Sequence, residues 1–412
     1  MRIVVYPHEL AIGGSQINAI DLAAAVRDRG HDVWVYSQAG PLVDYVVDEK
    51  GLPFVAAREL RYRPAPSRIA QLYQLARRER IDVIHGYEWP PCLDAYYGAR
   101  LLHRVPIVCT VLSMDFTPLI PTTVPLLMGT PALAEQVATR WAGQVGVMEP
   151  PIDTVKDRPD LDGSAFRARH GVAADELLVV SVSRLSVDLK LDALKDAIDG
   201  VAAVADQLPV RLILVGEGDA SAELSQRASA VNAAAGRTIV ELNGPMLDPR
   251  QAYAAADVVV GMGSSALRAM AHGKPVVVQG ERGFARTFDR ASAPEFFHHG
   301  FYGIGSGGSA AGVVAEALRR ILADPVARID LGRLGREAVV TRFSLDAAAD
   351  QLVGHYQAAC DSLSSRRDDL AQGIVMGVGA LATEVRLHMP NDKRRRRADR
   401  IDRLHAASAP TR

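Results

Sequence analysis

The sequence is poor in cysteine and has no long hydrophobic run. Its three cysteines, Cys92, Cys109 and Cys360, include no close ligand pair. This excludes a disulfide framework and a cysteine-based zinc site, and it suits a reducing compartment. No stretch reaches the roughly 18 uncharged apolar residues that a membrane-spanning helix needs, and the apolar run at 3–6 is too short for a signal peptide. We therefore expect a cytoplasmic protein.

An excess of charge of either sign is also lacking. The chain has 47 Lys and Arg against 48 Asp and Glu, which gives a formal net charge of -1. A protein whose whole surface bound nucleic acid would be markedly basic, so we expect no nucleic-acid partner. With 412 residues, of which 48% are hydrophobic, the chain is long enough for two domains, each with its own core.

Short apolar runs alternate with helical patterns through most of the sequence. This alternation is typical of parallel strands joined by crossover helices, and it predicts an α/β fold with doubly wound sheets. Strands are expected at 3–6, 32–36, 83–85, 107–112, 144–148, 177–182, 211–215, 238–242, 258–260 and 276–278. Helices are expected at 15–29, 191–204, 220–235, 249–255, 265–272 and 312–322.

A proline-containing polar segment at 149–164 interrupts the alternation, and we place the domain linker there. The predicted organisation is an N-terminal Rossmann-like domain (1–155), a C-terminal Rossmann-like domain (156–345), a helix packing back on the first domain (346–368), and an apolar segment followed by a basic, flexible tail (369–412). Successive doubly wound domains leave a cleft between them, and ligands bind there at the carboxyl ends of the strands.

Two cations follow the first predicted strand of the second domain. Arg184 comes two residues after Val182, and Lys190 lies six residues further along, where a helix is expected to begin. Cations at a helix start oppose the helix dipole, whereas a diphosphate bound there would be neutralised by them without a metal. The alternative is a solvated pair of side chains. We favour the anion site.

Turns rich in glycine or serine follow three of the predicted strands. Gly13 and Gly14 open the first helix, whose free N–H groups suit a phosphate. Gly216 and Glu217 follow the strand at 211–215, without the third glycine of a dinucleotide fingerprint. Ser264 begins a short helix after the strand at 258–260. A plain tight turn is the alternative at Gly13 and Gly14. For Gly216 a tight turn is the better interpretation, and it is compatible with a nucleotide nearby.

The segment at 261–278 resembles the donor-binding segment of the retaining glycosyltransferase family four. The resemblance covers roughly residues 1–360 and has five motifs in chain order: the Gly13-Gly14 loop, Arg184 with Lys190, the turn at Gly216, the loop at 244–248, and the Ala-Met-Ala-His-Gly-Lys-Pro-Val-Val stretch at 269–277. It implies the GT-B fold, in which two Rossmann-like domains face each other across a cleft. It also implies metal-independent sugar transfer, with retention of configuration and no cofactor, from a nucleotide diphosphate-sugar to an unidentified acceptor (a glycan, a lipid or a small metabolite).

The resemblance further implies roles for individual residues. Arg184 and Lys190 would hold the donor diphosphate. The loop containing Met246 and Leu247 would lie against the base, and the turn at 264–268 against phosphate and ribose. The complete predicted donor-binding set is Gly13, Gly14, Gly216, Glu217, Met246, Leu247, Ser264, Ser265, Arg268 and Glu281.

The sequence departs from the family at Val260 and Arg268, where relatives usually carry glutamates. We hypothesise that Arg268 contacts donor phosphate or an acidic donor sugar. Glu281 would then accept the hydrogen bonds of the ribose hydroxyls in place of the family glutamate. An ion pair between Arg268 and Glu281 is the alternative. His85 ends a predicted strand and is a candidate catalytic residue that orients substrate. Glu88 is a second candidate for this role, and a structural histidine is the alternative.

These departures leave two other functions open, a non-catalytic or partner-dependent nucleotide-sugar-binding homologue and a nucleotide-sugar epimerase. The end of the chain allows two interpretations as well. The apolar run at 372–385 precedes a stretch, 386–403, with eight Lys or Arg against three Asp. It is either a weak peripheral contact with the anionic inner face of the membrane or a disordered charged end.

Overall fold

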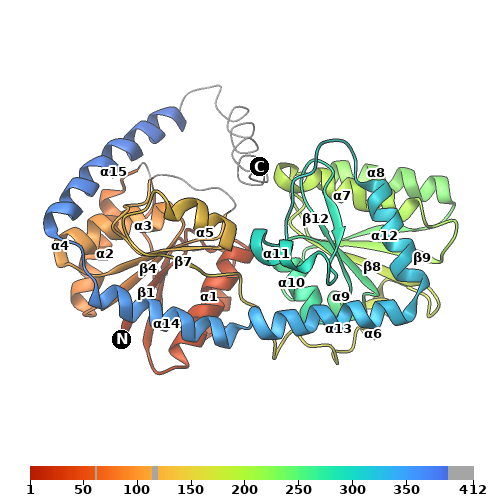
Figure 1. Ribbon diagram of the computed structural model, residues 1–412, viewed down its shortest axis with the longest axis horizontal. Coiled ribbons are helices and arrows are strands. Elements are labelled where there is room, and N and C mark those ends of the chain that lie inside the picture. The colour runs from red at the N-terminus through yellow and green to blue at the C-terminus, as the bar shows by residue number, and fades with distance from the viewer. Residues whose placement is uncertain (61–62, 114–118, 388–412) are drawn as a thin grey trace. The chain divides into compact units, whose positions relative to one another are not determined.

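The computed structural model describes residues 1–60, 63–113 and 119–387. The chain forms two compact units, each containing one sheet (Figure 1). Unit 1 comprises Met1–Pro151 and the chain from Leu345 onward, and unit 2 comprises Ile152–Ser344. The first unit is therefore built from two separate stretches of sequence.

Unit 1 has a seven-stranded parallel sheet in the order β3-β2-β1-β4-β5-β6-β7. Its central strands are buried almost throughout, because helices cover both faces, and so they are mostly apolar, with His85 and Thr110 as buried polar exceptions. The strands are β1 Arg2–Tyr6, β2 Asp32–Ser37, β3 Phe54–Ala56, β4 Val83–Tyr87, β5 Ile107–Val111, β6 Leu126–Met128 and β7 Val145–Val147. The helices are α1 Gly14–Arg27, η1 Tyr45–Glu49, α2 Pro66–Arg78, α3 Trp89–Ala95, η2 Tyr96–Arg100, α4 Leu101–His103, α5 Pro131–Ala138, α14 Leu345–Asp361 and α15 Arg366–Leu387.

Unit 2 has a six-stranded sheet in the order β10-β9-β8-β11-β12-β13, of which only β13 is antiparallel. Alternate residues of β8 enter two different cores: Leu178 and Val180 pack on one face, and Val179 on the other. The strands are β8 Leu177–Val182, β9 Val210–Val215, β10 Val240–Gly244, β11 Val258–Gly261, β12 Val276–Gln279 and β13 Ala285–Thr287. The helices are α6 Ser164–Arg169, α7 Val187–Ala202, α8 Ser221–Ala235, α9 Arg250–Ala255, α10 Ser264–Ala271, α11 Ala293–His299, α12 Ala311–Ala323 and α13 Pro325–Arg342.

The predicted α/β class with two doubly wound, Rossmann-like sheets is confirmed. The strands that the sequence did not reveal are β3, β6 and β13, each of three residues. So short a strand shows no periodicity of its own. The segment at 149–164, expected to be a linker, is only partly one. From Ile152 onward it belongs to unit 2, and it carries a buried side chain, Asp157.

The C-terminal part of the described chain packs on unit 1. Leu352 and Tyr356 of α14 are buried in the core that α1 and β1 also line. The predicted boundary at residue 369 falls inside α15, which is a single helix of 22 residues. The basic stretch beyond Leu387 lies outside the described residues. Within the described part of the chain, no helix is both long and apolar enough to cross a membrane.

Candidate functional site

The strand order of unit 2 reverses between β8 and β11. From β8 the sheet continues through β9 to β10 on one side, and from β11 it continues to β12 on the other. The connections that follow these two neighbouring strands therefore run in opposite directions. Doubly wound sheets bind their ligands at the carboxyl ends of the strands at such a point. Arg184 follows β8 and Ser264 follows β11, so both predicted site segments lie at this edge.

The Lys190 side chain folds back to the end of β8. The chain leaves helical geometry at Asp188 and Leu189, where the Leu189 φ is 71°, and the Lys190 ammonium donates to the Ser183 hydroxyl over 2.9 Å. Burial, and then the charge of Arg184, lower the pKa of Lys190 to about 8. Among the described residues no carboxylate forms an ion pair with this ammonium. A partly buried ammonium beside a guanidinium has the electrostatics of an anion site.

The turn at Gly216 and Glu217 supports the loop that carries Arg184. The Ser183 amide donates to Val215 O and the Leu185 amide to Glu217 O, each over 2.9 Å. Gly216 has a φ of +145°, and a Cβ at this position would lie 1.8 Å from the Ser183 carbonyl oxygen. No larger residue fits, so this glycine allows the two loops to approach. The Glu217 side chain is exposed beside them.

The loop after β10 joins this edge through the backbone, because the Gly216 amide donates to Gly244 O over 2.9 Å. Met246 packs partly into the core of unit 2, whereas Leu247 is 56% exposed. The Arg250 guanidinium holds the pKa of Asp248 below its ordinary value. Of the two residues expected to lie against a base, Leu247 thus offers the larger free apolar surface.

The helix α10 begins after a glycine in an unusual conformation. Gly263 has a φ of 58°, and its amide donates to Phe301 O over 2.6 Å. Ser264 and Ser265 are the first two helical residues, and the Tyr253 hydroxyl donates to Ser265 Oγ over 3.1 Å. Gly263, the residue before the helix, has no side chain that could cap it. The first amides of α10 can therefore bind an acceptor such as a phosphate oxygen.

Arg268 is compensated by an acid that the sequence did not reveal. Its Nε lies 3.7 Å from Asp157 Oδ2, and the other Asp157 oxygen lies 3.3 Å from His272 Nε2. Asp157 is only 3% exposed. Glu281 is also buried and accepts a hydrogen bond from the Tyr302 hydroxyl over 2.5 Å. Asp157 is thus one partner of Arg268, and Tyr302 is one partner of Glu281. An arginine is tolerated in the first turns of α10 because this carboxylate offsets its charge.

His85, a candidate catalytic residue from the sequence, has the surroundings of a structural histidine. This residue of β4 is completely buried. Its Nδ1 lies 2.8 Å from the Tyr356 hydroxyl and its Nε2 lies 2.7 Å from Thr110 Oγ1, so both ring nitrogens are occupied. Burial lowers the pKa of His85 to about 3, which keeps the imidazole neutral. His85 is a structural residue that connects α14 to the sheet.

Comparison with known proteins decides the family. A family model described as Glycosyltransferase Family 4 matches residues 12–135, and one described as Glycosyl transferases group 1 matches residues 176–324. The chain is a glycosyltransferase of the family 4 type. It is 23% identical over 402 residues to a D-inositol 3-phosphate glycosyltransferase of Pseudarthrobacter chlorophenolicus, covering 83% of this chain and 92% of the relative.

Solved structures show the same GT-B fold for this glycosyltransferase. A glycosyltransferase from Rickettsia africae ESF-5 superposes with a TM-score of 0.71 at 11% identity, covering 87% of this chain and 98% of that one. HepE from Anabaena in complex with UDP superposes with a TM-score of 0.67 at 20% identity, covering 87% and 100%. The predicted family and fold are confirmed.

The remaining predicted site residues of the glycosyltransferase lie in unit 1. Gly13 precedes α1 in an extended conformation, with a φ of -169°, and Gly14 is the first residue of that helix. They follow β1, which neighbours β4 where the strand order of this sheet reverses. All the other predicted donor-binding residues belong to unit 2.

Sequence reasoning missed two residues that shape these sites, Ser183 and Asp157, and it named Glu88 only as a candidate for orienting substrate. Ser183 directly precedes Arg184 but carried no signal of its own, and Asp157 stands in a segment interpreted as a linker. The Glu88 carboxylate accepts the amides of Leu112 and Ser113 over 3.0 Å each, and so fastens the loop after β5. Only a known three-dimensional arrangement reveals such partners.

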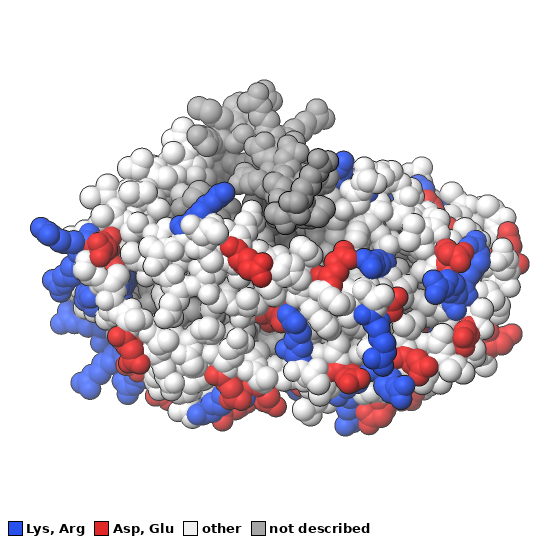
Figure 2. Space-filling view, in the orientation of Figure 1, with Lys and Arg blue, Asp and Glu red and all other residues white. Residues whose placement is uncertain are grey.

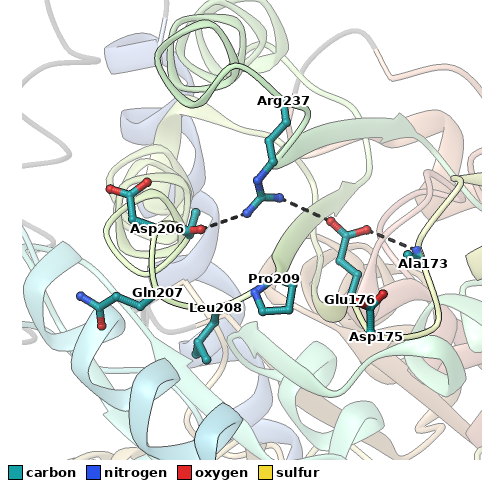
Figure 3. A pocket seen from close by; sticks show the side chains of 9 residues that line it. Ala173, Asp175, Glu176, Asp206, Gln207, Leu208, Pro209 and Arg237 are labelled. Atoms are coloured by element: carbon teal, nitrogen blue, oxygen red, sulfur yellow. Dashed lines mark hydrogen bonds and ion pairs between the residues drawn. The ribbon is translucent and has the colours of Figure 1, made fainter.

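A cavity of about 500 Å³ lies at the opposite edge of the unit 2 sheet, where β8 and β9 begin (Figure 3). The basic side chain of its lining, Arg237, is already paired. The Arg237 guanidinium donates to Ala205 O over 3.0 Å and lies 3.6 Å from Glu176 Oε1 (Figure 3). The lining has the three carboxylates of Asp175, Glu176 and Asp206 against this one guanidinium, so the cavity is acidic and offers no anion site. No group of three or more His, Cys, Asp or Glu within the described ranges is placed to hold a metal ion.

Proposed function

We propose that this glycosyltransferase moves a sugar from a nucleotide diphosphate-sugar to an acceptor with retention of configuration and without a metal ion. The observation that carries the proposal is the pairing of Arg184 and Lys190 at the end of β8, with Lys190 in no ion pair with a described carboxylate. A diphosphate supplies the missing negative charge. The UDP in the HepE complex supports this class of donor.

In this proposal the two cations act on the leaving group. As the bond between the sugar and the diphosphate breaks, negative charge develops on the phosphate oxygens, and Arg184 and Lys190 stabilise it. The amides at the start of α10 add partial positive charge, and Ser264 lies at that position. Arg268 contributes a further cation to a phosphate or to an acidic sugar.

The rest of the donor is held by less charged groups. Leu247 covers the base, and Glu281, fixed by Tyr302, accepts hydrogen bonds from the ribose. In a retaining transfer the donor phosphate itself can accept the proton of the acceptor hydroxyl, so the reaction needs no protein base. The proposal therefore assigns no proton transfer to the buried His85.

A thermal-shift experiment tests the donor site. The protein is melted with UDP, GDP, ADP or dTDP and with their sugar conjugates. A ligand at 100 times its Kd stabilises the native state by about 2.7 kcal/mol, which raises the Tm of a unit of this size by several degrees. We expect a rise for one base class in the wild type and none in Lys190→Gln.

Lys195→Gln is the matched control, because Lys195 also lies on α7 but pairs with Glu223. It should keep the full rise in Tm. The proposal fails if no nucleotide raises the Tm, or if both variants respond as the wild type does. Product analysis with and without acceptor then separates a transferase, which releases the nucleoside diphosphate only when it transfers the sugar, from an epimerase, which converts the donor alone.

A further inference from the structure

The outward side of α15 is apolar over four turns. Every exposed position of this helix between residues 370 and 385 carries an apolar side chain. The six large ones are 56–71% exposed. Their spacing of three and four residues places them along one side of the helix. We call this surface the α15 apolar face: Leu370, Ala371, Ile374, Val375, Val378, Leu381, Ala382 and Val385.

The opposite side of α15 is firmly attached to unit 1. Asp369 is 2% exposed and lies 3.0 Å from both Arg100 Nε and Arg104. Met376 and Ala380 are buried against Leu93 of α3. The helix is therefore packed on unit 1 through its other side, and the exposed apolar face is not a displaced part of the core. A soluble helix normally turns charged side chains outward, so an apolar surface of this length indicates a binding partner.

The chain beyond the helix indicates which partner this is. The stretch at 386–403 carries eight Lys or Arg against three Asp. A second copy seated on the α15 apolar face would bring a like-charged stretch with it. The chain beyond 387 has only Met389, Ile401 and Leu404 as large apolar residues, too few to cover the face. An anionic lipid surface is complementary to both features.

We propose that α15 lies on an anionic membrane surface, with its apolar face in the boundary between headgroups and acyl chains, and that the positive charge of the sequence after it favours anionic headgroups. The upper left edge of the molecule, where Figure 1 places α15, is largely free of charge in Figure 2. The helix is a surface anchor, since no described helix is able to span the bilayer. The proposal is independent of the donor site, because vesicle binding requires no turnover.

Co-sedimentation of the full chain with vesicles tests it. Vesicles of phosphatidylcholine alone are compared with vesicles that also contain phosphatidylglycerol, at low and at high salt. We expect binding to the anionic vesicles that salt weakens. The double variant I374S/V378S removes two large side chains of the apolar face and should bind at least about tenfold more weakly.

The chain offers a matched control in V326S/I329S on α13. Val326 and Ile329 are 67% and 69% exposed, against 71% for Ile374 and 65% for Val378. The control should bind as the wild type does. Equal sedimentation without lipid, or equal binding of I374S/V378S, overturns the proposal. So does a dimer in light scattering that I374S/V378S dissociates while neither protein binds vesicles, because a second copy then covers the face.

A second measurement guards against a variant that does not fold. Val378→Trp places an indole on the exposed side of α15 without removing apolar surface. Its emission, taken as the difference from the wild type, should shift to shorter wavelength when phosphatidylglycerol vesicles are added. An unchanged spectrum in a protein of wild-type Tm overturns the proposal.

Discussion

The Lys190 ammonium donates to the Ser183 hydroxyl, and the residue after Ser183 is Arg184, whose charge contributes to lowering the pKa of Lys190 to about 8. Two cations thus face the same edge of the unit 2 sheet. The arrangement is unfavourable in the free protein, since burial and a like charge both oppose the protonated lysine. It becomes favourable when an anion binds.

The first prediction is a dependence of UDP affinity on pH. The protonated form of Lys190 binds the diphosphate, and in the free protein it is lost as the pH rises through about 8. We therefore expect a Kd that rises by only about twofold between pH 7 and 8 and by up to about tenfold per pH unit above that. Calorimetric titration of the wild type and of Lys190→Gln measures this. A variant with the same pH profile would show that another group titrates.

The second prediction is that Lys190→Met stabilises the free protein. Removal of a partly buried ammonium that pairs with no carboxylate of the described residues should raise the free energy of unfolding at pH 7 by about 1–3 kcal/mol. The folded pKa lies below the unfolded value, so the wild type gains stability between pH 8 and about 10.4 and the difference shrinks there. Urea unfolding at three pH values tests this. A destabilised variant at pH 7 would contradict it.

The third prediction concerns Gly216→Ala. The new Cβ would lie 1.8 Å from the Ser183 carbonyl oxygen, so the loop carrying Arg184 must move. We expect a loss of about 3 kcal/mol or more and a fall in UDP affinity of at least tenfold. Gly236→Ala is the control, since Gly236 has a φ of +65° but nothing within 4 Å of its Cβ. It should lose only about 1 kcal/mol and keep its affinity.

The fourth prediction separates two roles of Arg268. Arg268→Glu places a second carboxylate beside Asp157, so it should lower both stability and donor affinity. Adding Asp157→Asn removes the repulsion and should restore much of the Tm without restoring donor affinity. Melting curves and donor titrations of the single and double variants test this. Recovery of affinity together with Tm would show that Arg268 acts only through folding.

The fifth prediction is that His85→Phe impairs folding and not chemistry. The substitution leaves the buried hydroxyls of Thr110 and Tyr356 without their partner, so we expect a loss of about 2–4 kcal/mol. The folded variant should keep its kcat within about threefold of the wild type and an unaltered pH profile. A kcat lower by a hundredfold, at a temperature where the variant is folded, would show that His85 takes part in the reaction.

How far the sequence predicts this molecule depends on how local each signal is. The long buried strands and the turn at Gly216 can be predicted from sequence, because an apolar run or a glycine in a turn is a property of a few consecutive residues. His85 illustrates the limit. Its position at the end of a strand suggested a site, but its partner Tyr356 is 271 residues away and no local pattern connects them. The pairing of Arg268 with Asp157 was missed for the same reason, since the two lie 111 positions apart.

The return of the chain to unit 1 at Leu345 has a consequence for synthesis on the ribosome. Domains emerge in sequence order and generally fold as they appear. Here unit 2 is complete at Ser344, whereas unit 1 still lacks Leu352 and Tyr356, which fill its core. Unit 1 is therefore synthesised first but completes its fold last. Its core stays incomplete until α14 has left the exit tunnel of the ribosome.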